Sequence, residues 1–311
     1  MATEKHADVG YLTGLITDGG VIVVVAASEK LEEEDVSHTF LAIHKEKSWK
    51  VFEEEVDIVS IASGTGKHAR HLISLGMNGE VIINEPAGVY HEHVHKGKNG
   101  PSSLRTMNEV RAIGDYFVTV GMRRQVYRRK IDTARWVRYD DGVLLDENSL
   151  AVAGFLSVDG FDENETYAVG YQGEIWLRNA QQWQQVDSPT SARLECVRCG
   201  GDGSVAICGV NGLVVLGRGT QWAIVESNGI DTTLKSIAFF KNRWYLADED
   251  GAIFVIDDGG LHAEPAFGSL GATTGVLDAN ASALVSVGEE DIFLFNGKKW
   301  QRLSHPAIDP T

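Results

Sequence analysis

Tyr167-Ala-Val-Gly-Tyr-Gln-Gly-Glu-Ile-Trp-Leu-Arg-Asn-Ala-Gln-Gln-Trp183 is the stretch of sequence from which the fold of this chain can be worked out. Its pattern predicts a strand ending at Gly170, a tight turn over residues 171–173, a second strand over 174–177 and a third strand opening near Trp183. Glycine suits the turn because it adopts a left-handed backbone without steric penalty.

The same pattern returns every 39 residues toward the C-terminus. The aliphatic position recurs as Ile175, Val214, Ile253 and Ile292, and the strand-opening position as Trp183, Trp222, Leu261 and Trp300. Gly170 returns as Gly209, and Gly173 returns as Gly212 and Gly251. Self-similarity at this period, with several short strands per copy, is typical of a β-propeller with one blade per repeat.

The whole chain is therefore predicted to be an all-β, seven-bladed propeller of four-stranded antiparallel blades, with about 39–45 residues per blade. A single domain, 1–311, would hold blades at about 10–56, 57–98, 102–145, 152–192, 193–231, 232–270 and 271–308. The first copies depart from the 39-residue period, which loop insertions explain; the stretch from Glu29 to Val36 is expected to be such a loop. The recurrent tryptophan is expected to pack between blades with its indole N–H bonded to a nearby acceptor, rather than to form a ligand platform.

This blade pattern resembles the broad propeller superfamily that includes WD-repeat and photosystem-assembly-factor-type proteins. The Gly-His and Trp-Asp marks of WD repeats are absent, as is the Ser-x-Asp-x-Gly-x-x-Trp box of sialidase-type blades. The resemblance implies an architecture only, because propellers serve both catalysis and binding.

The charge balance restricts the kinds of partner. The chain has 28 Lys and Arg against 44 Asp and Glu, a formal net charge of −16. Such an acidic surface disfavours nucleic acid, whose phosphates need cations, and also anionic membranes. A basic protein partner is expected, with the chain itself a monomer or weak oligomer.

The three cysteines are too few for a disulfide framework. Cys196 and Cys199 form one isolated pair, and Cys208 occupies a strand core position, so buried reduced thiols are expected. No basic start followed by an apolar core and cleavage site opens the chain, and the apolar run 21–27 is too short to cross a bilayer. A cytoplasmic location is expected.

Acidic residues concentrate in one set of turns. In a four-stranded blade, the turns between strands two and three and the links between blades emerge at the same end. That end is predicted to be acidic, with partner-binding residues Glu32, Glu33, Glu34, Asp35, Glu53, Glu54, Glu55, Asp140 and Asp141. Like charges crowded together repel one another and attract a basic partner. The alternative is that these side chains are merely solvated.

The run Tyr90-His-Glu-His-Val-His95 is the most conspicuous candidate for chemistry. Residues two apart share one face of a strand, so His91, His93 and His95 could hold zinc or another divalent metal. The sequence nominates no further ligand, and an outer edge strand kept polar is the alternative. No cofactor is otherwise expected.

Two further stretches have structural and functional interpretations. The basic run 122–130, with Arg135 and Arg138, could bind an anion or an acidic partner, but pairing with the chain's own acids is favoured. Gly64-Thr-Gly-Lys67 lacks the full spacing of a phosphate loop and is expected to be an ordinary loop.

Two classes of function follow. One is a non-enzymatic binding propeller whose acidic face grips a basic protein, as an antitoxin or immunity-type inhibitor or an assembly scaffold. The other is a propeller lyase or hydrolase, with a metal held by His91 and His93. No catalytic residue is singled out by the sequence.

Overall fold

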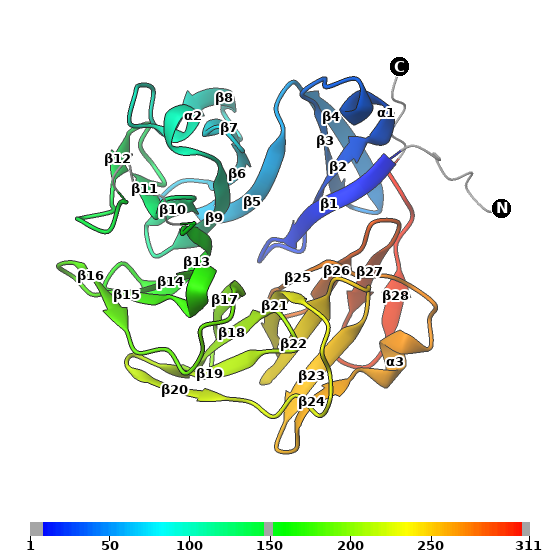
Figure 1. Cartoon of the computed structure of the whole chain (residues 1–311). Coiled ribbons are helices and arrows are strands. Elements are labelled where there is room, and N and C mark those ends of the chain that lie inside the picture. The colour runs from blue at the N-terminus through cyan, green and yellow to red at the C-terminus, as the bar shows by residue number, and fades with distance from the viewer. Residues whose placement is uncertain (1–8, 146–151, 307–311) are drawn as a thin grey trace. The chain divides into compact units, whose positions relative to one another are not determined.

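The computed structural model describes residues 9–145 and 152–306. Within them the chain is all-β and forms seven four-stranded antiparallel sheets, in each of which every strand pairs with its neighbours in sequence (Figure 1). These sheets are the blades of a seven-bladed β-propeller, so the predicted fold class is confirmed. No helix in the described ranges is long and apolar enough to cross a membrane.

The first compact unit, Met1–Ile58 with Thr232–Thr311, contains three of the sheets. Their strands are β1 (Val9–Ile16), β2 (Ile22–Ser28), β3 (Thr39–Lys45) and β4 (Ser48–Glu54); β21 (Leu234–Phe240), β22 (Arg243–Asp248), β23 (Ile253–Asp257) and β24 (Gly260–Ala263); and β25 (Val276–Ala279), β26 (Leu284–Val287), β27 (Ile292–Phe295) and β28 (Trp300–Arg302). Short helices α1 (Glu29–Glu33) and α3 (Pro265–Gly268) lie in connections. Strand β1 packs against β25 and β26, so the sheets nearest the two chain ends lie side by side.

The second compact unit, Val59–Asp231, contains the other four sheets. Their strands are β5 (Ile58–Thr65), β6 (Arg70–Gly76), β7 (Glu80–Glu85) and β8 (Gly88–His93); β9 (Met107–Ile113), β10 (Tyr116–Gly121), β11 (Gln125–Lys130) and β12 (Trp136–Arg138); β13 (Phe155–Asp162), β14 (Glu165–Gly170), β15 (Ile175–Arg178) and β16 (Trp183–Val186); and β17 (Leu194–Cys199), β18 (Val205–Gly209), β19 (Val214–Arg218) and β20 (Gln221–Ile224). A helical turn, α2 (Pro101–Leu104), follows β8, and a 3-10 turn, η1 (Tyr171–Gly173), joins β14 to β15.

The repeated turn glycine has the backbone conformation that the sequence predicts. Gly173, Gly212 and Gly251 have φ of +69°, +65° and +89°. Space forbids a side chain as well, because a Cβ on Gly173 would lie 2.1 Å from the carbonyl oxygen of Thr190 and one on Gly212 would lie 1.9 Å from that of Ile230. Glycine therefore lets each turn pack directly on the link to the next sheet.

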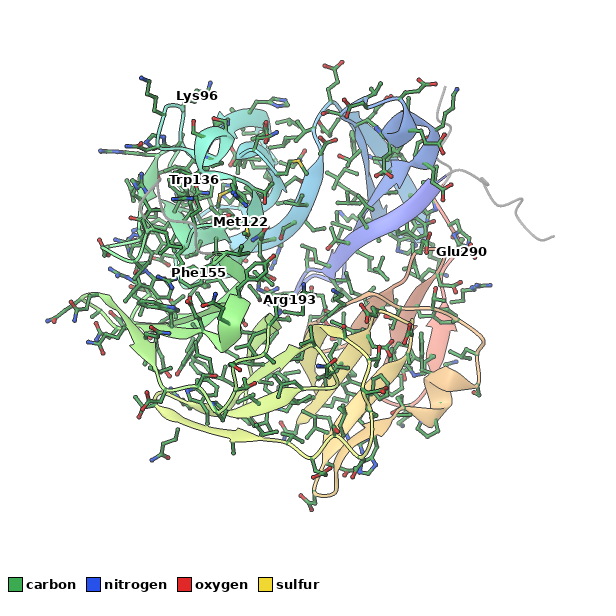
Figure 2. All side chains as sticks on the ribbon, viewed as in Figure 1. Lys96, Met122, Trp136, Phe155, Arg193 and Glu290 are labelled. Carbon is green, nitrogen blue, oxygen red and sulfur yellow. The ribbon has the colours of Figure 1, made fainter. Side chains whose placement is uncertain are left out.

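The recurrent tryptophan also lies where the sequence predicts, at the opening of the fourth strand. Trp183 donates to the carbonyl of Tyr139 (2.7 Å), Trp136 to Glu92 (3.0 Å) and Trp49 to the carbonyl of Ser304 (2.8 Å), each time reaching the preceding sheet (Figure 2 labels Trp136). Trp222 bonds within its own sheet, to Gly219. Trp300 packs on Phe295 and Phe267 but its indole N–H has no partner in the described part of the chain.

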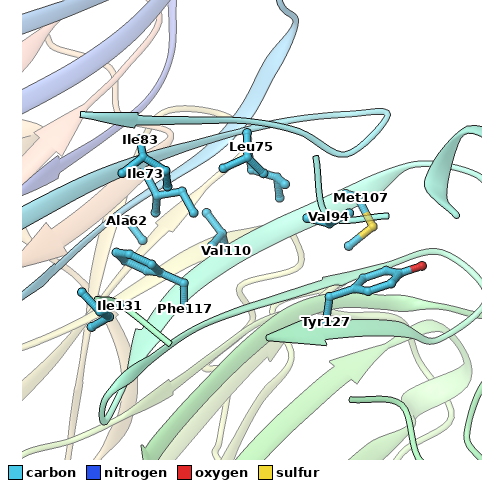
Figure 3. Close-up of a cluster of buried hydrophobic side chains, with 11 residues drawn as sticks. Ala62, Ile73, Leu75, Ile83, Val94, Met107, Val110, Phe117, Tyr127 and Ile131 are labelled. Carbon is cyan, nitrogen blue, oxygen red and sulfur yellow. The ribbon is translucent and has the colours of Figure 1, made fainter. Parts of the chain in front are cut away.

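Apolar side chains fill the spaces between neighbouring sheets of a unit. The cluster between the sheets β5–β8 and β9–β12 includes Ile73, Val110 and Phe117, all fully buried (Figure 3). Each blade buries its two faces only against its neighbours, as expected for a repeat architecture.

The first strands of neighbouring sheets are joined by recurring polar contacts. The first strand of a sheet pairs with another strand along one edge only, so its other edge carries N–H groups that need acceptors. Side chains on the first strand of the preceding sheet supply them, at Ile16 to Asp278 (2.9 Å), Val110 to Ser60 (3.1 Å), Val158 to Glu109 (2.7 Å), Val197 to Ser157 (3.0 Å) and Leu277 to Ser236 (3.0 Å). We call this contact the inter-blade clasp.

Replacing a clasp acceptor should destabilise the fold. Ser236→Ala leaves the buried N–H of Leu277 without an acceptor and is expected to lower the free energy of unfolding by about 1–2 kcal/mol. Chemical denaturation followed by tryptophan fluorescence measures the loss. Ser282→Ala, in the exposed turn between β25 and β26, is the control and should change stability by less than about 0.5 kcal/mol. Equal effects of the two substitutions would contradict a structural role for the clasp.

Candidate functional site

The connection between β2 and β3 carries the densest run of acidic residues. The sequence predicts a loop here, but residues 29–33 form one turn of helix, α1, because Ser28 caps it by accepting the N–H of Leu31 (3.4 Å). No residue of α1 is buried, and the helix lies against the end of β2 (Figure 1). The connection is pinned at its base by His38, which accepts the N–H of Ser28 (2.8 Å).

The end of β4 lies beside this connection. Antiparallel pairing places Glu53 opposite Phe40 and Glu54 opposite Thr39. Beyond the strand, the hydroxyl of Ser37 donates to Asp57 (2.9 Å), which holds the two acidic segments together. We call these segments, 29–37 and 53–57, the acidic surface of the first sheet.

The predicted binding residues of this surface are mostly exposed and unpaired. Only Glu54 among the seven is half-buried. Within the described ranges no ion pair is formed by the other six carboxylates, those of Glu32, Glu33, Glu34, Asp35, Glu53 and Glu55. Lys30 is the one cation in segments 29–37 and 53–57, against nine carboxylates, so a further cation brought to this surface would be attracted.

Acidic turns in the other two sheets of the same unit are used differently. Asp248 is buried and accepts the N–H of Ala252 (2.7 Å), and burial raises the pKa of its carboxyl. Asp250 accepts the hydroxyl of Thr232 (3.0 Å), and Asp291 pairs with Arg302. These carboxylates shape their turns, which leaves the first sheet as the strongest candidate binding surface of the unit.

Asp140 and Asp141 belong to the second unit and are engaged by arginines. Asp140 is 8% exposed and accepts two hydrogen bonds from Arg138, the shorter at 2.7 Å. Asp141 is exposed but lies 2.7 Å from the guanidinium of Arg178. A basic partner would have to displace these arginines, so the two aspartates differ from the acidic surface of the first sheet.

Most arginines of the basic run after Met122 have partners within the protein, whereas Nε and Nη2 of Arg123 find no hydrogen-bond partner among the described residues. Arg124 forms a two-pronged ion pair with Glu174, and Arg129 one with Glu92 at 2.9 Å for both bonds. Arg128 stacks on the ring of Tyr139, with the guanidinium carbon 4.0 Å from its centroid. Together with the Arg138 pair, the ion pairs of Arg124 and Arg129 confirm the predicted pairing with the chain's own acids for these three arginines.

Removing one member of a buried pair should be costly. Glu92→Ala leaves the guanidinium of Arg129, whose side chain is 6% exposed, without its carboxylate partner and also removes the acceptor of the Trp136 indole N–H. We therefore expect the free energy of unfolding to fall by about 3 kcal/mol. The control is Asp115→Ala, whose pair with Lys130 is exposed and 3.8 Å long and should contribute less than about 0.5 kcal/mol. Urea denaturation compares them, and equal losses would show that the Arg129 pair is not structural.

The histidine run does not converge as a strand pattern predicts. Strand β8 ends at His93, so His95 lies beyond the alternation. His91 is exposed, whereas His93 is half-buried, accepts the N–H of His95 (3.3 Å) and has its pKa lowered by burial. Across residues 9–145 and 152–306, no group of three His, Cys, Asp or Glu side chains is arranged to hold a metal ion. The metal site stays a prediction that no contact supports.

The Gly64–Lys67 stretch is the end of β5 and a hairpin turn. The N–H of Lys67 donates to both carboxylate oxygens of Asp132, at 3.2 and 3.0 Å. An internal carboxylate thus takes up the N–H of Lys67. Residues 66 and 67 form the predicted loop, whereas Gly64 and Thr65 belong to β5. Sequence reasoning missed the buried His71 beside it, which lies 2.9 Å from Glu85 and bridges toward Asp132.

The three cysteines form no disulfide with one another. All three are free, with Cys196 and Cys208 buried and Cys199 half-buried. Burial raises the pKa of the Cys199 and Cys208 thiols, which keeps them protonated and unreactive at neutral pH. The burial predicted for the cysteines is therefore seen for Cys196 and Cys208, and their reduced state stays a prediction.

Comparison with known proteins identifies a relative by sequence and several solved structures that share the fold. No family model matches the chain. The immune protein Tsi7 of Pseudomonas aeruginosa is 31% identical over 304 residues, covering 94% of this chain and 96% of that protein. Among solved structures, YCF48 bound to D1 peptide has a TM-score of 0.65 at 14% identity and covers 94% of this chain and 93% of that one. The WD40 repeats of RRP9 have a TM-score of 0.64 at 11% identity and cover 97% and 96%. These structures show the fold, and the predicted resemblance to the propeller superfamily is confirmed.

Proposed function

The chain belongs to the family of the immune protein Tsi7, and on this premise we propose that it is a non-enzymatic, protein-binding propeller that acts as an immunity-type inhibitor. It would bind a basic protein toxin and block it. The near-complete alignment with one immune protein carries the proposal. Peptide binding by YCF48, a propeller of the same fold, is compatible with it.

The acidic surface of the first sheet is the proposed contact for the basic partner. Its six unpaired carboxylates would steer the partner and pair with the partner's cations. Asp140 and Asp141 are proposed as secondary contacts, because a partner must compete with Arg138 and Arg178 for them. A cytoplasmic location is part of the proposal and agrees with three free cysteines.

An inhibitor that works by binding should act stoichiometrically. The toxin candidates are the products of the reading frames next to this gene. We expect one of them to slow growth when expressed alone, co-production of this chain to restore growth, and its purified toxic activity to fall in proportion to added chain until one chain is present per toxin.

Full loss of that toxic activity with much less than one chain per toxin would instead indicate an enzyme that turns the toxin over. Failure of every neighbouring product to be neutralised would contradict the immunity proposal.

Charge reversal on the acidic surface should slow complex formation. Glu33→Lys with Glu34→Lys is expected to weaken binding about tenfold at low salt, mostly through the association rate. The matched control is Glu46→Lys with Asp258→Lys, which changes the net charge equally in exposed turns at the other end of the same unit's sheets.

Surface plasmon resonance with the neutralised toxin, at low and high salt, compares the two variants. High salt should remove the difference between the first variant and the wild type, because it screens exposed charges. Equal weakening by both variants would show that net charge, rather than this surface, drives association.

A further inference from the structure

A surface groove lies in the second unit, at the end of the sheet β17–β20. It has a volume of about 330 Å³ and is lined by the turn between β18 and β19, the end of β20 and the residues that follow β20. Pockets that hold small ligands start near about 300 Å³, so the groove has room for one long side chain.

The groove is held open by backbone packing. Asn211 and Gly212 both have positive φ, and Gly212 lies so close to the carbonyl of Ile230 that no side chain fits between them. Past β20, the N–H of Val225 still donates to the carbonyl of Val214 (2.9 Å), which holds the next residues beside the turn. The walls are therefore set before any partner arrives.

The lining combines aliphatic side chains with polar groups and a single charged residue. Leu213 and Val225 are half-buried, and Ile224 is 53% exposed, so each leaves aliphatic surface for a partner to cover. Glu226 is the one charged residue among those described around the groove, and its exposed carboxylate has no ion pair in the part of the chain that the structure covers. The nearby Arg193 pairs with Glu195 (Figure 2 labels Arg193).

An aliphatic wall next to an unpaired carboxylate fits a side chain that combines an apolar stem with a cationic head. We propose that this groove binds an arginine side chain of a protein partner, with the stem against Ile224 and Leu213 and the guanidinium on Glu226. Arginine buries its stem on apolar surface and pairs with a carboxylate through two parallel hydrogen bonds. The assignment rests on the proposed function, since a basic partner supplies the arginine.

The test uses the full chain and two blocked tripeptides as probes. The first is acetyl-Gly-Arg-Gly-amide, and the second carries citrulline, a neutral isostere, in place of arginine. NMR titration of the amide signals of Asn211, Gly212 and Glu226 should give millimolar affinities, with the arginine peptide bound about three- to fivefold more tightly.

Two variants test the contributions of the carboxylate and of the aliphatic wall separately. Glu226→Gln should remove the preference for arginine and leave the citrulline peptide unchanged. Ile224→Ser should weaken both peptides by the same factor, about tenfold. Asp202→Asn, an exposed carboxylate at the other end of the same sheet, should change neither.

Equal affinity of the wild type for the two peptides, or shifts that leave these three amides unmoved, would overturn the assignment. A dimer in sedimentation that Ile224→Ser converts to a monomer would also overturn it, because the groove would then be covered by a second copy of this chain. Peptide binding without toxin neutralisation would leave the groove assignment standing and remove the immunity proposal. Toxin neutralisation without a preference for the arginine peptide would remove the groove assignment and leave the immunity proposal standing.

Discussion

The inter-blade clasp is the constraint on which the rest of the molecule depends. The first strand of each sheet has one edge whose N–H groups find no strand to pair with, and a buried N–H without an acceptor costs free energy. A serine, aspartate or glutamate on the neighbouring first strand meets this need. Where the acceptor is charged it needs cations of its own, and Glu109 accordingly also binds Arg198 (2.7 Å). Sheet-to-sheet register is thus fixed by directional bonds in addition to apolar packing.

This requirement explains how charge is allocated. In the second unit the carboxylates of Glu92, Glu109 and Glu174 are each paired with an arginine from another segment of the chain. Such residues stabilise the fold and cannot serve a partner without weakening it. The acidic surface of the first sheet contrasts with them, because six of its exposed carboxylates have no ion-pair partner among residues 9–145 and 152–306. The charges that the fold leaves unpaired, rather than the net charge of −16 as a whole, therefore indicate the candidate binding surface.

The sequence predicts the fold well because its strongest signal is local and repeated. Glycine at 173, 212 and 251 and an aromatic or aliphatic residue opening each fourth strand report backbone geometry directly. Pairings between strands far apart in sequence, such as Glu92 with Arg129, leave no such pattern. Two local features also differ from the prediction. Ser28 caps a helical turn where a loop was expected, and β8 ends before His95. The groove beside Ile224 forms where the turn between β18 and β19 meets the end of β20 and the residues that follow it, which no linear pattern reveals.

Binding a toxin quickly and binding it for a long time call for different surfaces. Exposed like charges raise the association rate, but each exposed pair adds little affinity once salt screens it. Slow dissociation needs a desolvated anchor, such as an aliphatic wall with one carboxylate to orient the bound side chain. The first unit offers the unpaired carboxylates and the second offers the groove. If both units contact one partner, salt should change how fast the complex forms, while the side chain in the groove should set how long it lasts.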